Sequence, residues 1–153
     1  MSNHLSGVLL FDQGMDVRQW TKRDIFEYFG GEEKYIHHGQ IAGGIILIRK
    51  CANSVKMIDE WYYICHNHYN LLTDSKSKQP EFDIFIENRH DQSILNMLSI
   101  KYDAARLPFG ELYRQDEDWS KMIVYPIWAA RKRDAQRSIF FRIKRKLKSL
   151  LKR

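Results

Sequence analysis

Four polar side chains, Arg89, His90, Asp91 and Gln92, follow one another where a loop is predicted to become a helix. A carboxylate at a helix N-terminus is stabilised by the exposed backbone N–H groups of the first turn, whether it caps the helix or faces a cleft. Asp91 therefore has two interpretations. It is a helix cap beside surface hydrogen bonds, or it is a general base, which needs hydrogen-bond reach to a substrate proton.

Two histidine groups, His37-His38 and Cys65-His66-Asn67-His68, contain side chains of the kind that bind zinc. On a helix the cysteine and the last histidine of the second group share one face, whereas His66 points elsewhere. Such a group does not supply the four tetrahedrally arranged ligands of a zinc site. We therefore expect no metal site in this chain.

Short apolar segments alternate with helical patterns, which predicts an α/β fold. Strands are expected at residues 4–11, 45–48 and 122–125, and the second, fully apolar, should lie in the middle of a sheet. A first helix is expected to begin with Thr21 as its N-cap and to stop at Gly30 and Gly31.

The longest helix is expected to begin at Asn53 or Ser54 and to end near residue 73. Its apolar positions recur at helical spacing, so one face should pack on the sheet. These positions are Met57, Ile58, Trp61, Ile64, Cys65, His68, Leu71 and Leu72.

A polar loop at residues 75–81, which we expect to be a mobile flap, precedes an aromatic segment at 82–85. The next helix should start at Asp91 or Ser93. Its expected apolar face consists of Ile94, Leu95 and Leu98.

Composition places the chain among single-domain proteins, with 153 residues of which 44% are hydrophobic. The apolar run at 45–48 is much shorter than the roughly 20 residues that a membrane span needs. Cys51 and Cys65, the two cysteines, are too few for a disulfide framework. We therefore expect a cytoplasmic protein in a reducing compartment.

The net charge of +6 divides unevenly between a body at residues 1–130 and a tail at 131–153. The tail holds 11 basic residues and one acid, so the body, with 14 basic and 18 acidic residues, is net acidic. A helix predicted at 136–152 aligns five apolar side chains on one stripe, namely Ile139, Ile143, Leu147, Leu150 and Leu151.

A basic amphipathic helix of this kind is typical of binding to an anionic membrane surface. The tail at residues 136–153 would thus hold the protein on the inner face of the membrane as a peripheral protein. The same stripe can dock on another protein. Nucleic acid ranks last as a partner, because the body is acidic and no recognition motif is present.

The segment HDQSILNML, which begins at His90, resembles the DQ-containing segment of GT-A-fold glycosyltransferases, the nucleotide-diphospho-sugar transferases. WTKRDIF at residues 20–26 and QIAGG at 40–44 are similar to parts of bacterial capsule and lipopolysaccharide glycosyltransferases. The resemblance covers roughly residues 7–102. It implies a partial GT-A-like, Rossmann-like mixed sheet flanked by helices, followed by the basic amphipathic helix.

The resemblance also implies roles for six residues. Asp91 would be catalytic, either accepting the proton of the acceptor hydroxyl in an inverting enzyme or positioning the acceptor in a retaining one. The acceptor-binding residues would be Gln40, Gly43, Gly44, His90 and Gln92. Glycine suits the turn at 43–44 because backbone approaches a sugar closely there.

Two features of such enzymes are missing from this chain. They usually carry an Asp-x-Asp metal motif upstream of the acceptor pocket, but Asp116-Glu117-Asp118 lies downstream and follows no apolar strand. Many also use a late histidine as a metal ligand, whereas the last histidine here is His90. A nucleotide-binding P-loop or GxGxxG fingerprint is absent too.

We therefore expect an acceptor-side fragment of a glycosyltransferase, incomplete for catalysis alone, that transfers sugar from a nucleotide-sugar to a capsule or lipopolysaccharide acceptor. This chain would hold no cofactor, and a donor-binding half would bring the nucleotide-sugar with a divalent Mn or Mg ion. The alternative is a non-catalytic remnant or interaction module bound to a membrane or a partner through its basic tail.

Overall fold

The computed structural model describes residues 6–112. The elements follow in the order β1 (Val8–Asp16), η1 (Val17–Gln19), α1 (Arg23–Tyr28), β2 (Gly39–Ile41), β3 (Leu47–Ile48), α2 (Ala52–Asn67), η2 (Tyr69–Leu72), α3 (Asp91–Lys101), β4 (Ala105–Pro108) and α4 (Phe109–Leu112). The strand expected at 122–125, the tail at 131–153 with its helix, and the Asp116-Glu117-Asp118 motif lie outside the described residues.

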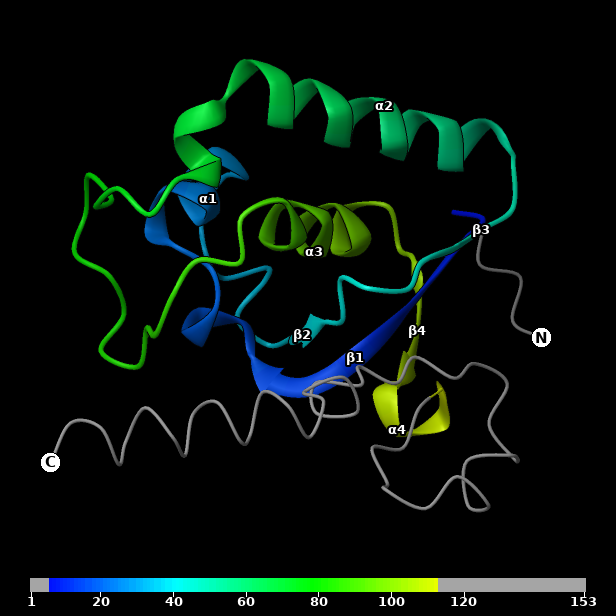
Figure 1. Ribbon diagram of the computed structural model, residues 1–153, viewed down its shortest axis with the longest axis horizontal. Helices are drawn as coiled ribbons and strands as arrows, with labels where there is room; N and C mark the ends of the chain where they lie inside the picture. Colours follow the sequence, from blue (N-terminus) through cyan, green and yellow to red (C-terminus); the bar gives the residue numbers. More distant parts are fainter. Residues whose placement is uncertain (1–5, 113–153) are drawn as a thin grey trace, which may run out of the picture. The chain divides into compact units, whose positions relative to one another are not determined.

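Strand β1 runs through the middle of a four-stranded mixed sheet (Figure 1). On one side it pairs in parallel with β4, with Leu9 opposite Ala105. On its other side it pairs antiparallel with β3 and then with β2, with Val8 opposite Ile48 and Asp12 opposite Ile41. The residues described thus form a mixed α/β structure, and β1 extends well beyond the predicted end at residue 11.

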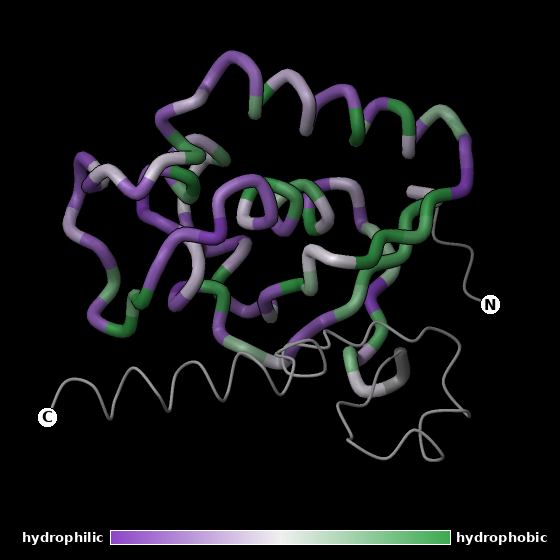
Figure 2. Tube along the Cα trace, viewed as in Figure 1, coloured by the Kyte–Doolittle hydropathy of each residue, from purple (hydrophilic) through white to green (hydrophobic). Residues whose placement is uncertain are grey.

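Helix α3 lies between the sheet and α2 (Figure 1). Residues 93–99 are all buried, so the helix is enclosed on every side. Ile94, Leu95 and Leu98, which were predicted to form its apolar face, are at most 1% exposed. Figure 2 shows hydrophobic residues along this helix and hydrophilic ones along much of the outer helix α2. The predicted helix start at Asp91 is confirmed.

The prediction that α2 packs on the sheet was wrong, because α3 occupies that position and α2 packs on α3 instead. Its buried residues Met57 and Ile64 do lie on the predicted face. The predicted caps were wrong as well. Cys51 is the N-cap, in a capping box in which its N–H donates to Ser54 Oγ at 2.9 Å. The helix ends at Asn67 rather than near residue 73. Leu71 and Leu72, which were predicted to belong to its apolar face, lie in η2 instead, where Leu71 is buried.

The prediction of a central strand at residues 45–48 was wrong. β3 contains only Leu47 and Ile48, whose exposed fractions are 44% and 49%. The aromatic segment at 82–85 also forms no strand. An apolar run alone does not distinguish a buried strand from an exposed one, because burial depends on which elements cover it.

Thr21 is buried but does not cap α1, whose N-cap is Lys22. The first N–H groups of α1 are instead satisfied by the loop after η2. Arg23 N donates to Glu81 Oε2 at 2.7 Å, and Asp24 N donates to Ser77 Oγ at 3.2 Å. The predicted stop of this helix at Gly30 and Gly31 is confirmed, with φ angles of 89° and 110° that favour glycine.

Replacing Leu98 by alanine should destabilise the protein strongly, because the side chain is 0% exposed at the centre of α3. We expect the free energy of unfolding to fall by about 2–5 kcal/mol. Val55→Ala, at a 42% exposed position of α2, is the control and should change it by no more than about 0.5 kcal/mol. Urea denaturation followed by circular dichroism measures both, and equal losses would contradict the central placement of α3.

Candidate functional site

Residues 90–92 are each held by a hydrogen bond to a different element. The three bonds join His90 Nδ1 to Leu72 O of η2 (2.5 Å), Trp61 Nε1 of α2 to Asp91 O (3.0 Å), and Gln92 Nε2 to Ile41 O of β2 (2.6 Å). Since a carbonyl oxygen only accepts, His90 carries its proton on Nδ1. These bonds fix the backbone at the start of α3 from three directions.

The backbone turns sharply at His90, whose φ of 52° and ψ of −122° are rare for a residue with a side chain. Such a conformation costs on the order of 1–3 kcal/mol and persists only where its surroundings hold it. The preceding residue is held too, because Arg89 N donates to Trp20 O at 3.0 Å. Ser93 Oγ donates to the same carbonyl at 2.7 Å.

A pocket of about 560 Å³ lies beside this turn. It is lined by residues 73–76 and 85–92 together with Lys22 and Glu81, so Asp91 is part of its wall. The Asp91 side chain is exposed, and within residues 6–112 its carboxylate accepts no hydrogen bond. The turn is therefore rigid in its backbone while its carboxylate stays available.

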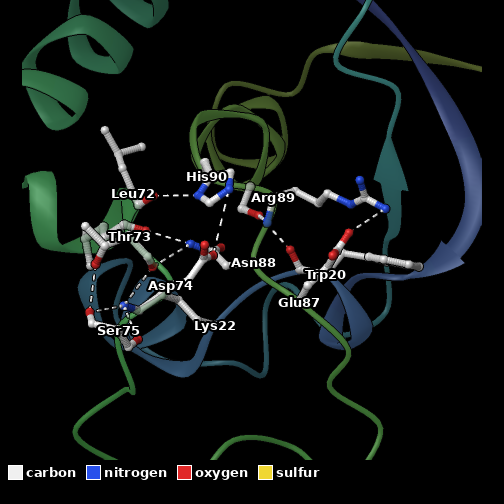
Figure 3. Close-up of polar contacts among 12 residues, drawn as sticks. Trp20, Lys22, Leu72, Thr73, Asp74, Ser75, Glu87, Asn88, Arg89 and His90 are labelled. Atoms are coloured by element: carbon white, nitrogen blue, oxygen red, sulfur yellow. Dashed lines mark hydrogen bonds and ion pairs between the residues drawn. The ribbon is translucent and has the colours of Figure 1, made fainter.

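A buried lysine, Lys22, is also part of the pocket wall (Figure 3). The Lys22 side chain is 2% exposed, and its ammonium donates to Asn70 O and to Ser75 O, each at 3.0 Å. Asn88, also buried, donates from Nδ2 to Leu71 O at 2.9 Å. These two side chains hold the carbonyls that follow α2 in one orientation and thereby shape the pocket.

The other basic groups beside the start of α3 are engaged as well (Figure 3). Arg89 forms an ion pair of 2.9 Å with Glu87, and its guanidinium lies 4.3 Å from the centre of the Trp20 ring. His90 Nε2 lies 3.8 Å from Asp74 Oδ1. The pocket thus contains both signs of charge: Lys22 and Arg89 are engaged within the protein, whereas Lys76 and Asp91 are exposed.

The glycine turn reaches the start of α3 from the other side. A Cβ added to Gly43 would lie 2.7 Å from Gln92 Oε1, so the backbone of this turn contacts the Gln92 side chain directly. A Cβ added to Gly44 would have nothing within 4 Å. Neither glycine lines the pocket, so the structure brings Gly43 to Gln92 but not to the same cavity wall as Asp91.

Gln40 is 0% exposed and lies away from the pocket. Its Oε1 accepts a hydrogen bond of 3.1 Å from Asn96 Nδ2 of α3. Of the six predicted site residues, His90, Asp91 and Gln92 therefore meet in one pocket, Gly43 supports Gln92 from outside it, and Gly44 and Gln40 have other surroundings.

Arg106 of β4, which the sequence did not single out, joins α3 to the sheet. Its guanidinium donates to Asn96 Oδ1 at 2.8 Å and to Gly39 O at 3.0 Å, and burial lowers its pKa. Asp12 of β1 lies 3.5 Å from the same group. The sequence analysis missed Lys22, Asn88 and Arg106 because none of their hydrogen-bond partners is a near neighbour in the sequence. No local sequence pattern therefore identifies these three residues.

Cys65 lies near enough to Asp91 for the carboxylate to affect it. Burial, and then the charge of Asp91, raise the pKa of the Cys65 thiol to about 11. The thiol thus stays protonated at neutral pH and is neither a nucleophile nor a ready metal ligand. Across residues 6–112 no group of three or more His, Cys, Asp or Glu side chains could hold a metal ion.

No family model, curated protein or solved structure matches the chain. Within the described part, no helix has both the length and the apolarity needed to cross a bilayer.

Replacing Gly43 by alanine should push the Gln92 side chain aside and break its 2.6 Å bond to Ile41 O. We expect a loss of about 1 kcal/mol in the free energy of unfolding. Gly44→Ala is the matched control, because nothing lies within 4 Å of its added Cβ, and should change stability by no more than about 0.5 kcal/mol.

A double-mutant cycle tests the cause of that loss. In a Gln92→Ala background, Gly43→Ala should cost nothing further, because the side chain that it displaces is gone. An unchanged cost in that background would show that the turn does not act through Gln92.

Proposed function

We propose that this chain is the acceptor-side part of a GT-A-fold glycosyltransferase, which transfers a sugar from a nucleotide-sugar to a capsule or lipopolysaccharide acceptor. The observation that carries the proposal is the exposed Asp91 carboxylate on a backbone turn held at residues 90, 91 and 92. A catalytic group is effective when its position is set before the substrate arrives.

The chemistry of the pocket supports an uncharged, hydroxyl-rich ligand. The ammonium of Lys22 is bonded to backbone carbonyls, and Arg89 is paired with Glu87. A diphosphate would have to break these contacts to reach Lys22 or Arg89, so among the lysines and arginines that line the pocket it would find only the exposed Lys76. Sugar hydroxyls both donate and accept, so they suit a wall of paired charges and oriented amides. The pocket therefore fits the acceptor better than the donor.

In the proposed reaction the acceptor hydroxyl oxygen forms a bond to the anomeric carbon, and the bond from that carbon to the nucleoside diphosphate breaks. Asp91 accepts the hydroxyl proton if the enzyme inverts the anomeric centre, and orients the acceptor if the enzyme retains it. Gln92 and His90 flank Asp91 but are bonded to backbone carbonyls. Their part is to hold the turn and border the acceptor.

The divalent ion of such enzymes does not fit the residues described here, because residues 6–112 contain no cluster that could hold it. No step of the proposed reaction is derived through a metal. The nucleotide-sugar and its ion would be held by a donor-binding half.

Asp91→Asn should abolish sugar transfer, because the amide has the shape of the carboxylate but cannot take up the proton. We expect the rate to fall by about 10²–10⁴-fold, with little change in stability because the side chain is exposed. The measurement is incorporation of labelled sugar into surface-glycan precursors by membranes of the producing organism, with each variant placed at the gene's own locus.

Asp83→Asn is the matched control, since Asp83 is exposed and does not line the pocket. It removes the same charge and should leave the rate unchanged. Normal transfer in the Asp91→Asn variant, at an equal protein level, would refute a catalytic role for Asp91. The non-catalytic interaction module would then be the better account.

We also propose that residues 136–153 hold the protein on the inner, anionic face of the membrane. The support is the concentration of basic residues in a segment whose apolar residues recur at helical spacing. Each cation near such a surface contributes on the order of 1 kcal/mol.

Deleting residues 136–153 should release the protein from anionic liposomes. The full chain should sediment with vesicles that contain phosphatidylglycerol, and less so as salt is raised, because salt screens exposed charges. Neutral phosphatidylcholine vesicles are the control and should retain little of either protein. Equal sedimentation of the full and truncated chains with anionic vesicles would rule the membrane proposal out.

A further inference from the structure

The short strand β3 and the start of α2 place large aliphatic side chains on the surface. Leu47 and Ile48 are 44% and 49% exposed, and Val55, in the first turn of α2, is 42% exposed. Three exposed cations lie between and beside them, and in Figure 2 the hydrophobic β3 leads directly into the hydrophilic turn before α2. We name this set the β3–α2 surface; it consists of Leu47, Ile48, Arg49, Lys50, Val55 and Lys56.

The turn between β3 and α2 is held by hydrogen bonds on both of its sides. The buried Ser54 donates from Oγ to Arg49 O at 2.8 Å and accepts from Cys51 N at 2.9 Å. Arg49 N donates to Gly7 O at 2.8 Å. The backbone that carries the β3–α2 surface is thus ordered before any partner arrives, which lowers the entropy cost of binding.

The three cations of the β3–α2 surface form no ion pair within the described part of the chain. Arg18 and Lys101, by contrast, each form an ion pair of 2.6 Å. Residues 34–58 also contain no aspartate or glutamate, although the body as a whole is net acidic. The β3–α2 surface is therefore a basic region of an acidic body, and its charge is complementary to an anionic partner.

The mixture of aliphatic side chains and unpaired cations favours an anionic lipid surface as that partner. Single-stranded nucleic acids are bound by stacking on aromatic rings, and residues 43–58 contain none. The core of a protein interface is enriched in aromatic residues and depleted in lysine. In a lipid interface, aliphatic side chains enter the acyl boundary while lysine and arginine reach the headgroups.

We propose that the β3–α2 surface is a second membrane contact, made by the folded body in addition to residues 136–153. Its three aliphatic side chains enter the lipid interface, and its three cations bind anionic headgroups. The inference rests on the proposed membrane location. A second contact has a physical reason, because a single weak signal gives marginal, reversible attachment, whereas two give stable attachment.

The first test neutralises two cations in the full chain. Arg49→Gln, Lys50→Gln should lower the partition coefficient on phosphatidylcholine vesicles that contain phosphatidylglycerol by about thirtyfold at low salt, at about fivefold per cation. Vesicle sedimentation measures the coefficient. The loss should shrink as salt is raised, because salt screens the charges.

The matched control is Lys76→Gln, Lys78→Gln. It removes the same charge from an exposed loop, and residues 74–81 include no exposed large hydrophobic side chain. Binding to the same vesicles should change by no more than about twofold, because charges outside the contact are screened.

The second test replaces the aliphatic side chains of β3. Leu47→Thr, Ile48→Thr should weaken binding by about tenfold, and the loss should persist at high salt because it is not electrostatic. Threonine keeps the strand propensity, and both positions are about half exposed, so circular dichroism should show equal folding of all the variants.

Equal losses in the Arg49, Lys50 variant and the loop control would overturn the proposal, since net charge alone would then explain binding. Unchanged vesicle binding in the Arg49, Lys50 variant would overturn it too. If that variant instead lost binding to double-stranded DNA, the partner would be a nucleic acid. If the Leu47, Ile48 variant lost only self-association, the partner would be a second copy of the chain.

Failure of the membrane role proposed for residues 136–153 gives a different result. Deleting that segment would then leave sedimentation unchanged, whereas Arg49→Gln, Lys50→Gln would still reduce it. If only the β3–α2 surface fails, the deletion releases the protein and the Arg49, Lys50 variant binds as the parent does.

Discussion

The enclosure of α3 is the constraint on which the other features of the structure depend. Residues 93–99 are all buried, yet Ser93, Asn96 and Ser99 are polar. Unpaired polar groups in a core are costly, so each must find a partner as the helix packs. Ser93 donates to Trp20 O, while Asn96 and Ser99 contact Arg106 from β4, and Asn96 also donates to Gln40. These bonds allow only one position of α3 along its axis, because a slide of one turn would leave several buried groups unpaired.

The candidate site follows from that fixed position. The first residues of α3 cannot shift, so residues 90–92 meet the same partners in η2, α2 and β2. The unusual backbone at His90 is tolerated for the same reason, since the contacts on both sides of it are already set. The strain is thus concentrated beside the one carboxylate of the turn, and that carboxylate remains exposed. A fixed backbone with an available acid group is the arrangement that proton transfer or acceptor positioning requires.

Local signals in the sequence were reliable where the physics is local. Gly30 and Gly31 end α1 because their backbone angles favour glycine wherever they occur. Asp91 opens α3, and Ile94, Leu95 and Leu98 share one face by helical spacing and are buried as predicted, although the fold buries the rest of residues 93–99 too. The caps of α1 and α2 were predicted wrongly. The α1 N–H groups are satisfied by Glu81 and Ser77, more than fifty residues away, and such a cap leaves no trace near the helix.

By itself, the sequence determined the mixed α/β content, the start of α3 and the uneven charge of body and tail, since each depends mainly on neighbouring residues. Only the tertiary structure decided that α3 lies beneath α2, that β3 is exposed, that Lys22 and Asn88 shape the pocket beside Asp91, and that Arg106 holds α3 to the sheet. The physical reason is that a buried polar group is paired by whatever the folded chain brings within hydrogen-bond distance. That distance does not depend on how far apart two residues are in the sequence. The sequence could therefore single out Asp91, but it could not predict which residues form the pocket around it.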